Sequence, residues 1–597
     1  MSRRGGQTRS HSKLARPPQP MPAPLIGTVP VTRYVWTATL LGAFCFLVYV
    51  SNPRKPLSAD SVPARLLPFS ILRERNLDLD EFAWLRRLDP QPYFLRQAAN
   101  GHWRSRYPVT VPVAVTPLYL PVTWWLQHHH IDDDDVRFRL AAVFMERIVA
   151  ALITAASASL VFLAAATMTP RHRAAAVALL YAFGTSTWAI GSQALWQHGP
   201  AELALAGLSL FLILPAQRRT AVAAGAFAAL AVLARPTMAI FALLAAVFMW
   251  RERRSHLVAF LSVPLVGALL VAAYFNTRLL ELAHIDLGHG AFGIPRLRAL
   301  VGLLVSPNRG LFVYVPLAVL AVPALLRPPA SSPRWLTYAR TGVAAYLLVY
   351  SAWAGWWGGH CYGPRFLTDL MPVLALSAIP IGERLWCRPA GRVVVAGLAA
   401  CGVMVQGIGA YCDDNAWNAL PQSVDRAPER VWDWQDTQIL RAARAGWHGF
   451  DLVPLLWQTA LNPQPAHLSL FQAGDLAGQI TLDQPVPLHY RRGRAETLRV
   501  QITNLGGRTW PAFSDYGLMQ VWGLYRWWSS GRMVAGEGGF IPLPRNLAAG
   551  ESISLDARID APKRPGFYEL ELLIAQALAA DRGAAGNATI RVPAEIR

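Results

Sequence analysis

The chain has 597 residues, of which 53% are hydrophobic and 15% are charged. A typical soluble domain has about 25% charged residues. Apolar runs of about 20 residues, the length needed to cross roughly 30 Å of hydrocarbon, recur through the first two thirds of the chain. These features indicate a polytopic α-helical membrane protein and exclude a disordered, a collagen-like or a disulfide-rich secreted chain.

The formal net charge is +20, from 56 Lys and Arg against 36 Asp and Glu. A nucleic-acid-binding protein would concentrate such a charge on a soluble module. Here much of the excess lies in short gaps between apolar runs, where it acts as a signal of membrane topology. We therefore expect no nucleic acid among the partners.

Residues 1–33 precede the first apolar run and are rich in Pro and Arg, without an acidic residue. We expect a disordered basic tail that stays in the cytoplasm.

Eleven membrane helices are predicted from the apolar runs. They lie near residues 34–51, 138–168, 174–192, 199–215, 220–235, 236–250, 256–276, 309–326, 338–354, 366–382 and 391–411. Arg-rich short loops such as 251–254 alternate with loops that contain no Lys or Arg, such as 191–202 and 351–364. Because cationic short loops stay inside, the pattern predicts a cytoplasmic N-terminus and an external C-terminus.

The stretch Val109–Leu126 is apolar, but Pro112, Pro117 and Pro121 break any straight helix. If this stretch crossed the membrane, the Arg-rich loops after it would all lie outside. We therefore predict a re-entrant or interfacial segment. Residues 52–137 then form one large external loop of a transmembrane domain that covers residues 34–411.

The composition changes after residue 411. Residues 412–465 are Trp-rich and polar, and they predict an external helical linker. Residues 466–597 predict an external antiparallel β-sandwich of about seven short strands. The clearest strands are Leu498–Thr503, Met519–Tyr525, Ser552–Ile559 and Tyr568–Ile574.

The first external loop carries acidic candidates for catalysis. Asp60 follows the first helix closely, and a carboxylate at the mouth of a bundle can accept a proton as a general base. The alternative for Asp60 is a helix cap. Glu81 and Arg106 are secondary candidates in the same loop, and the alternative for Glu81 is a solvated or capping charge.

A second constellation joins two predicted helices on the outer side. His198 and Glu202 are four residues apart and share a face if that turn is helical. A Glu about one turn into a membrane helix is costly unless it faces a partner or a wet cavity, which makes Glu202 a functional candidate. The alternatives are a charge that reaches back to the interface for Glu202, and a satisfied polar group for His198.

External cations form a third set of candidates. The guanidinium group presents a planar fork of donors that suits phosphate oxygens. The alternative for Arg365 is an ion pair with Asp369, one turn further on. Taken together on the outer face, the candidates for holding a lipid-linked phosphate are Arg235, Arg309, His360, Tyr362 and Arg365.

The phrases SPNRGLFVYVP (306–316) and WWGGHCYGPRFLTDLMP (356–372) resemble those of bacterial membrane glycosyltransferases of the GT-C superfamily. The internal N-terminus, the large first external loop and its early acid resemble the same superfamily, which includes protein O-mannosyltransferases and aminoarabinose transferases of lipid A. The resemblance covers roughly residues 34–411. It implies a multi-pass protein of the bacterial inner membrane with a periplasmic C-terminal domain.

The resemblance also implies a reaction. A sugar moves from a polyprenyl-phosphate carrier to an envelope glycan, lipid or protein acceptor on the outer face. Asp60 matches the first-loop acid, Glu202 matches the second-loop acid, and Arg309, His360, Tyr362 and Arg365 are the candidates for stabilising the phosphate that leaves. Ser61 stands where many relatives carry a second acid. The expectation is therefore no cofactor and no assigned metal ligand, with a divalent cation left as an alternative.

The C-terminal region resembles an immunoglobulin-like sandwich in TNLGGRTWP (503–511) and APKRPGFYELELLI (561–574). Such a module would bind the acceptor or an envelope glycan, and the alternative is a structural cap.

Two other classes of protein compete with a glycosyltransferase. A transporter or flippase of lipid-linked sugars explains the helices and the external arginines. However, we find no pairing of broken helices between two halves, the usual sign of a repeat-built transporter. A non-catalytic envelope scaffold is the third possibility.

Overall fold

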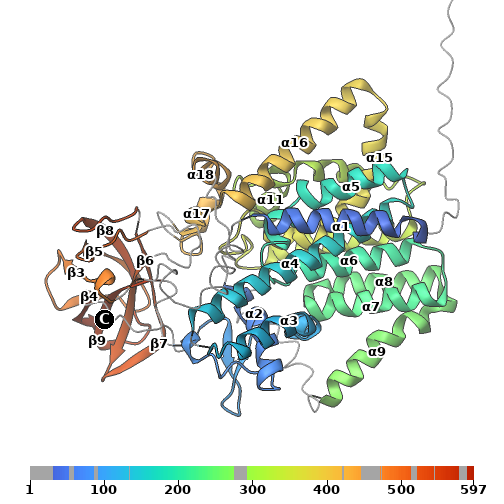
Figure 1. Cartoon of the computed structure of the whole chain (residues 1–597). Helices are drawn as coiled ribbons and strands as arrows, with labels where there is room; N and C mark the ends of the chain where they lie inside the picture. The colour runs from blue at the N-terminus through green and yellow to red at the C-terminus, as the bar shows by residue number, and fades with distance from the viewer. Residues whose placement is uncertain are drawn as a thin grey trace, which may run out of the picture.

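The computed structural model of the chain describes residues 31–52, 59–86, 92–133, 135–274, 292–413, 415–419, 423–445, 471, 473–511, 521–543, 545–576 and 588–597. Most of the predicted tail (1–30), residues 446–465 of the predicted linker and residues 466–470 of the predicted sandwich lie outside these ranges. Figure 1 shows a helical bundle and a β domain, with the short helices α17 and α18 between them.

Helices account for most of the described chain up to residue 445. They are α1 (Val35–Val50), α2 (Val62–Arg73), α3 (Thr110–His128), α4 (Val136–Ala165), α5 (Arg171–Gly184), α6 (His198–Ile213), α7 (Arg218–Ala234), α8 (Ala239–Glu252), α9 (Leu257–Tyr274), α11 (Leu297–Val305), α12 (Leu311–Tyr314), α13 (Val322–Leu326), α14 (Arg334–Ala352), α15 (Met371–Trp386), α16 (Pro389–Tyr411), α17 (Ala416–Ala419) and α18 (Gln438–Ala445). Short non-α helices include η2 (Ala59–Ser61), the π-helix η4 (Thr187–Gly191), η7 (Pro316–Ala321) and η8 (Arg365–Leu370).

Local sequence signals fix several helix starts. The Asp135 side chain accepts a hydrogen bond from the Arg137 backbone N–H at 2.7 Å and so caps α4. At the start of α7, the Gln217 backbone N–H donates to the Thr220 hydroxyl at 3.0 Å within a capping box. These caps satisfy backbone donors that have no partner inside the helix.

Fewer helices meet the length and composition of a membrane span than the eleven predicted. Within the described ranges, three are long and apolar enough to cross a membrane: Arg137–Ala165, Arg365–Trp386 and Pro389–Tyr411. The structure has helix within each of the eleven predicted ranges. Many of these helices have only 14 to 17 residues, which is about 21–26 Å at 1.5 Å per residue and short of the roughly 30 Å hydrocarbon core.

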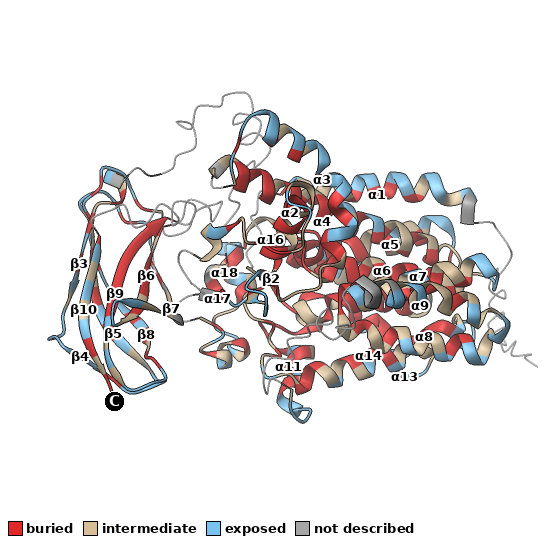
Figure 2. Ribbon diagram, turned by 90° about the horizontal axis from the view of Figure 1, so that it is seen from below, coloured by how far each residue is buried: buried red, intermediate tan, exposed pale blue. Residues whose placement is uncertain are grey.

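The outer surface of the bundle is apolar along several helices. On α1, one side is buried through Leu41, Cys45 and Tyr49, whereas Leu40 and Phe44 on another side of the helix are exposed. Figure 2 shows the same division on the outer helices, with buried residues facing inward and exposed residues facing outward. Exposed apolar stripes of this kind suit a hydrocarbon environment, so the bundle has the surface of a membrane-associated protein.

The segment predicted to be broken by prolines is one continuous helix, α3. The expectation that Pro112, Pro117 and Pro121 interrupt it was wrong. Pro112 lies in the first turn, where a backbone N–H needs no partner within the helix. Pro117 and Pro121 are four residues apart, so their missing donors fall on one face of the helix. The helix is absent from the candidate spans found in the described ranges, and it packs on α2 and α4.

The bundle has two chemically different ends. Arg218 begins α7, and Arg235 follows its last residue. Asp369 precedes α15, and Glu383 near the end of α15 pairs with Arg173 at the start of α5. Arg235 and Asp369 bond to each other. Arg-rich loops therefore gather at one end of the bundle, and the residues considered as a site lie at the other.

The described C-terminal strands form two sheets, ordered β4-β10-β9-β6-β7 and β3-β5-β8. The strands are β3 (Gly478–Leu482), β4 (Leu488–Tyr490), β5 (Ala495–Asn504), β6 (Val521–Ser529), β7 (Arg532–Pro542), β8 (Ser552–Asp560), β9 (Gly566–Gln576) and β10 (Thr589–Ile596). Alternating residues of β8, such as Ile553, Ala557 and Ile559, are buried with Trp510 in one core. Strand lies within each of the four predicted ranges, with residues 519 and 520 outside the described part of the chain. However, β4 and β10 pair in parallel, so the domain is not purely antiparallel.

The described part of the predicted linker belongs to the bundle rather than merely following it. Val424 and Val431 are buried in the core cluster of the bundle helices. Arg426 donates to the Tyr525 hydroxyl of the β domain at 3.1 Å and pairs with Asp560. This segment therefore contacts both the bundle and the β domain.

Candidate functional site

Asp60 lies in η2, just before α2, and its carboxylate contacts Tyr93, Tyr107 and Arg365. The hydroxyls of Tyr93 and Tyr107 donate to Oδ1 at 2.8 Å each, and Arg365 pairs with Oδ2. Ser61 is the N-cap of α2, and it makes no side-chain cap bond. The helix-cap alternative for Asp60 was therefore wrong, because its side chain points to Arg365 and the tyrosines.

The protonation of Asp60 follows from these contacts. Burial raises the pKa of the Asp60 carboxyl, but Arg365 and the hydroxyls of Tyr107 and Tyr93 lower it to about 2. Asp60 is therefore ionised at neutral pH. While it stays paired with Arg365, it is a weak proton acceptor.

Arg365 is the first residue of η8 and connects Asp60 to the interior. Its Nε donates to His198 Nε2 at 3.1 Å, and its Nη1 donates to the Gly358 carbonyl at 3.3 Å. Its guanidinium carbon lies 4.5 Å from the centre of the Trp196 ring, a cation–π contact. The side chains of Arg365 and Asp60 are 12% and 17% exposed, so the pair is mostly buried but keeps some surface in contact with solvent.

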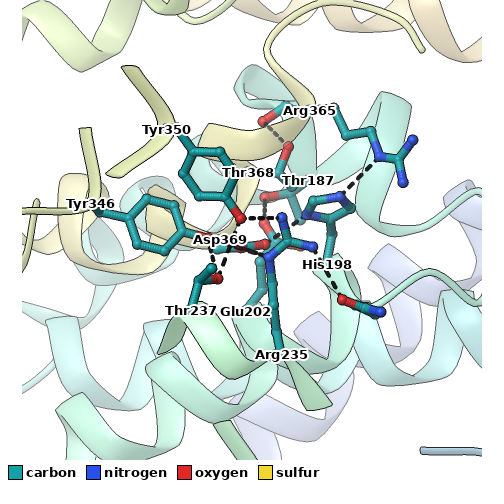
Figure 3. Close-up of polar contacts among 12 residues, drawn as sticks. Thr187, His198, Glu202, Arg235, Thr237, Tyr346, Tyr350, Arg365, Thr368 and Asp369 are labelled. Atoms are coloured by element: carbon teal, nitrogen blue, oxygen red, sulfur yellow. Dashed lines mark hydrogen bonds and ion pairs between the residues drawn. The ribbon is translucent and has the colours of Figure 1, made fainter. Parts of the chain in front are cut away.

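Behind this pair lies a buried set of charges, shown in Figure 3. Asp369 accepts from His198 Nδ1 at 2.7 Å and pairs with Arg235 Nε at 2.6 Å. Because a carboxylate accepts at Nδ1 and a guanidinium donates to Nε2, the contacts fix a neutral His198 with its proton on Nδ1. One continuous chain of polar contacts thus runs through Asp60, Arg365, His198, Asp369 and Arg235. We call these five residues the charged network.

Arg235, a predicted phosphate ligand, lies at the inner end of the charged network. It donates to the Tyr350 hydroxyl at 2.6 Å and to the Tyr346 hydroxyl at 3.3 Å. Its side chain is nearly buried, and Asp369 already neutralises its charge. It therefore supports the network from behind rather than facing outward.

The alternative ion pair between Arg365 and Asp369 is wrong. Arg365 pairs with Asp60, and Asp369 pairs with Arg235. The reason is the local helix type: η8 is a 3-10 helix with three residues per turn. At that repeat, residues four apart point to different faces, unlike in an α-helix.

Glu202, the predicted second-loop acid, is fully buried in α6 and does not reach the interface. Its Oε1 accepts from the Thr187 hydroxyl of η4. Its α-helical spacing from His198 is as predicted, but the acid that bonds His198 is Asp369. The snorkelling alternative was wrong, and the geometry leaves Glu202 without the access to solvent that a catalytic base needs.

Every N–H group of the Arg309 side chain donates a hydrogen bond to another group of the protein. Its guanidinium donates to the carbonyls of Trp357, Asn308 and Gly359 and to the side chains of Gln438 and Asn418, at 2.6–3.0 Å. A guanidinium has five N–H donors, so none remains for a phosphate. The structure thus corrects the expectation for Arg309: it fastens the loop 357–359 to the segment after the last bundle helix.

His360 and Tyr362 lie on the same loop, and their side chains contact α16 and the segment that follows it. His360 Nε2 is 3.0 Å from the Ser423 hydroxyl and 3.6 Å from Asp425 Oδ2. The Tyr362 hydroxyl donates to the Val405 carbonyl at 2.9 Å, and the ring is buried. Tyr362 is therefore a packing residue, which corrects its assignment to the phosphate. His360, which is partly exposed, joins the loop to the segment around Asp425.

Glu81 and Arg106, the secondary candidates in the first external loop, have surroundings different from each other. Burial raises the pKa of Glu81 to about 7. Arg106 Nε donates to the Leu95 carbonyl at 3.1 Å, and it is the next residue, Tyr107, that reaches Asp60.

One group of side chains in the described ranges could hold a metal ion. Asp78, Asp80 and His102 each offer one ligand atom, and these atoms lie within 4.8 Å of one another. Carboxylate oxygens and an imidazole suit a divalent transition metal. However, the hydrogen bond to Asp80 raises the pKa of His102, so a proton competes with a metal for that ring.

Tyr93, Tyr107 and Asp369 are site residues to which sequence reasoning gave no functional role. Asp369 was considered only as a partner of Arg365. The tyrosines lie 33 and 47 residues from Asp60, and they are common in loops, so their types and spacing gave no signal. The Tyr-Pro pair at 107–108 before an apolar run was the closest indication.

No family model and no curated protein matches this chain. It is similar to a CARDB domain from Pyrococcus furiosus, solved in complex with di-metal ions. Identity there is 15%, and the match covers 21% of this chain and 92% of that one with a TM-score of 0.14. It is also similar to the alkylpurine DNA glycosylase AlkC of Pseudomonas fluorescens, at 13% identity, 74% and 97% coverage and a TM-score of 0.17. TM-scores this low support no conclusion about fold or function.

Proposed function

We propose that this protein is a membrane glycosyltransferase that moves a sugar from a polyprenyl-phosphate carrier to an acceptor on the outer face of the membrane. The observation that carries the proposal is the Asp60–Arg365 pair, a partly exposed carboxylate and guanidinium in direct contact. A transfer of this kind needs an acid–base group for the acceptor and a cation for the phosphate that leaves. The pair supplies both within one contact.

The roles follow from the chemistry of the groups. The acceptor hydroxyl loses its proton to Asp60 as its oxygen attacks the anomeric carbon. The bond between that carbon and the phosphate oxygen breaks, and the negative charge that stays on the carrier phosphate is stabilised by Arg365. His198 and Asp369 act behind Arg365 as positioning residues, because they touch neither reactant.

The orientation in the membrane is part of the same proposal. Arg-rich loops, represented by Arg173 and Arg218, lie at the end of the bundle opposite Arg235 and Asp369. Under the positive-inside rule this end is cytoplasmic, and the charged network faces outward. We propose that the whole bundle is embedded as a multi-pass protein of a bacterial inner membrane. Its shorter helices would be accommodated by local thinning of the bilayer, and the β domain would lie in the periplasm.

The test is a donor-consumption assay with the full-length protein in proteoliposomes. The substrates are a panel of undecaprenyl-phosphate-linked sugars, with a bacterial envelope fraction as the source of acceptors, and the product measured is undecaprenyl phosphate. We expect release by the unaltered protein, and a loss of about 10²–10³-fold for Arg365→Ala. Movement of an intact lipid-linked sugar between leaflets without release would identify a flippase instead. Neither release nor movement would favour a scaffold.

A further inference from the structure

Two anions bind the same Arg365 guanidinium if the proposed function holds. One is the Asp60 carboxylate, which already occupies Nη2. The other is the phosphate of the carrier, which would need the Nη2 donors, because Nε already donates to His198 and Nη1 to the Gly358 carbonyl. A guanidinium fork binds one bidentate anion well, so the two anions compete.

Each member of the pair has an anchor that does not depend on the other. Asp60 is held at Oδ1 by Tyr93 and Tyr107, whereas Arg365 binds at Oδ2. Arg365 is held at Nε by His198 and across its face by Trp196. Separating Arg365 from Asp60 therefore leaves both side chains held by these other contacts and removes Arg365 from Oδ2 of Asp60.

The contact suppresses the basicity of Asp60, and burial acts in the opposite direction. With Arg365 in contact, the pKa of Asp60 is about 2, although burial alone would raise it. A phosphate that neutralises Arg365 removes the main favourable charge near the carboxylate. Asp60 then becomes the stronger base that abstraction of a hydroxyl proton requires.

We propose that the Asp60–Arg365 ion pair is an autoinhibitory contact that the carrier phosphate opens by exchange. The phosphate takes the guanidinium from Asp60, and the released Oδ2 then accepts the proton of the acceptor hydroxyl. This proposal rests on the proposed function, because it requires a phosphate at Arg365. The exchange itself makes and breaks no covalent bond. The exchange couples activation of the base to binding of the donor, so Asp60 stays a weak proton acceptor until the carrier phosphate binds.

Binding of undecaprenyl phosphate tests the exchange without any turnover. The full-length protein in nanodiscs is titrated with undecaprenyl phosphate, and with neutral undecaprenol as the control for the lipid chain. The variants are Asp60→Asn, Arg365→Ala and, as a matched control, Arg334→Ala, which removes an exposed Arg that pairs with Glu252. Inorganic phosphate added as a competitor distinguishes recognition of the headgroup alone from recognition of the lipid.

The exchange predicts effects of opposite sign on the two members of the pair. Asp60→Asn removes the internal competitor and keeps the tyrosine contacts, so undecaprenyl phosphate should bind about tenfold more tightly, a change of about 1.4 kcal/mol. Arg365→Ala should bind about tenfold more weakly or worse, and Arg334→Ala should bind like the unaltered protein. Undecaprenol should bind equally to all of them.

Two results would overturn the proposal, and they differ in what else they refute. If Arg365→Ala weakens binding but Asp60→Asn binds no more tightly than the unaltered protein, the phosphate site stands and the exchange is wrong. If Arg365→Ala binds as well as the unaltered protein, no phosphate is held at Arg365, and the proposed function falls with the exchange. A melting temperature for each variant in the same nanodiscs confirms that binding is compared among folded proteins.

Discussion

Asp369→Asn removes one buried negative charge from the charged network and leaves the shape of the side chain almost unchanged. Asp369 has no exposed side-chain surface, and it bonds Arg235 at 2.6 Å and His198 at 2.7 Å. Without its charge, the nearly buried guanidinium of Arg235 loses this carboxylate as a counter-ion. Removing one partner of a buried ion pair costs about 3–5 kcal/mol, and we expect a loss of that size in the free energy of unfolding.

Two controls separate a buried-charge effect from a general loss of stability. Glu252→Gln breaks the pair with Arg334, whose side chain is 78% exposed, and surface pairs contribute at most about 1 kcal/mol. The double variant Asp369→Asn, Arg235→Gln removes both buried charges, and it should recover roughly 2 kcal/mol of the loss. The assay is denaturant unfolding of the purified protein in mixed micelles. A loss for Asp369→Asn no larger than that for Glu252→Gln, or a double variant no more stable than the single one, would contradict a buried-charge effect at Asp369.

Three further predictions follow from the described contacts. Burial raises the pKa of Asp60, but Arg365 and two tyrosines lower it from an ordinary 3.8 to about 2. The ionised carboxylate therefore contributes roughly 2 kcal/mol to the free energy of unfolding. This contribution is complete above about pH 5 and is lost as the pH falls through 2. The unaltered protein should therefore lose more unfolding free energy than Asp60→Asn between about pH 5 and pH 3, and parallel curves would contradict the pairing. Arg309→Lys keeps the charge but cannot fill five acceptors, so it should lower the melting temperature clearly more than Arg334→Lys does; an equal shift would return Arg309 to the phosphate candidates. Single cysteines that replace the exposed His130 and His172 should react with a membrane-impermeant reagent from the outside and from the inside respectively, and labelling of both from one side would overturn the proposed topology.

The positions of the helices were predictable because apolar runs are local features. Every predicted apolar range contains helix, and the strand at 552–559 is present as β8. Whether each helix is long enough to cross a bilayer was not predictable, because caps and short non-α helices shorten the regular segments. The sequence around Pro117 shows a related limit, since a helix that is packed on neighbours tolerates a lost hydrogen bond that isolated-helix reasoning counts as a break.

The candidate site was predictable in its residue types but not in its pairings. Asp60 and Arg365 are 305 residues apart, and no local rule could join them. The pairing of Arg365 with Asp369 was expected from α-helical spacing, and it failed because that segment is a 3-10 helix. The role of Arg309 could not be inferred, because its partner Gln438 comes from a segment with no sequence signal for contact with the bundle.

If the proposed function and the exchange hold, a carrier phosphate binds at Arg365 and separates it from Asp60. An experimental structure of the full-length protein with undecaprenyl phosphate tests this most directly. We expect phosphate oxygens within about 3 Å of the Arg365 guanidinium, with the Asp60 carboxylate still held by Tyr93 and Tyr107 but out of contact with Arg365. A phosphate bound elsewhere while the Asp60–Arg365 pair stays closed would contradict it.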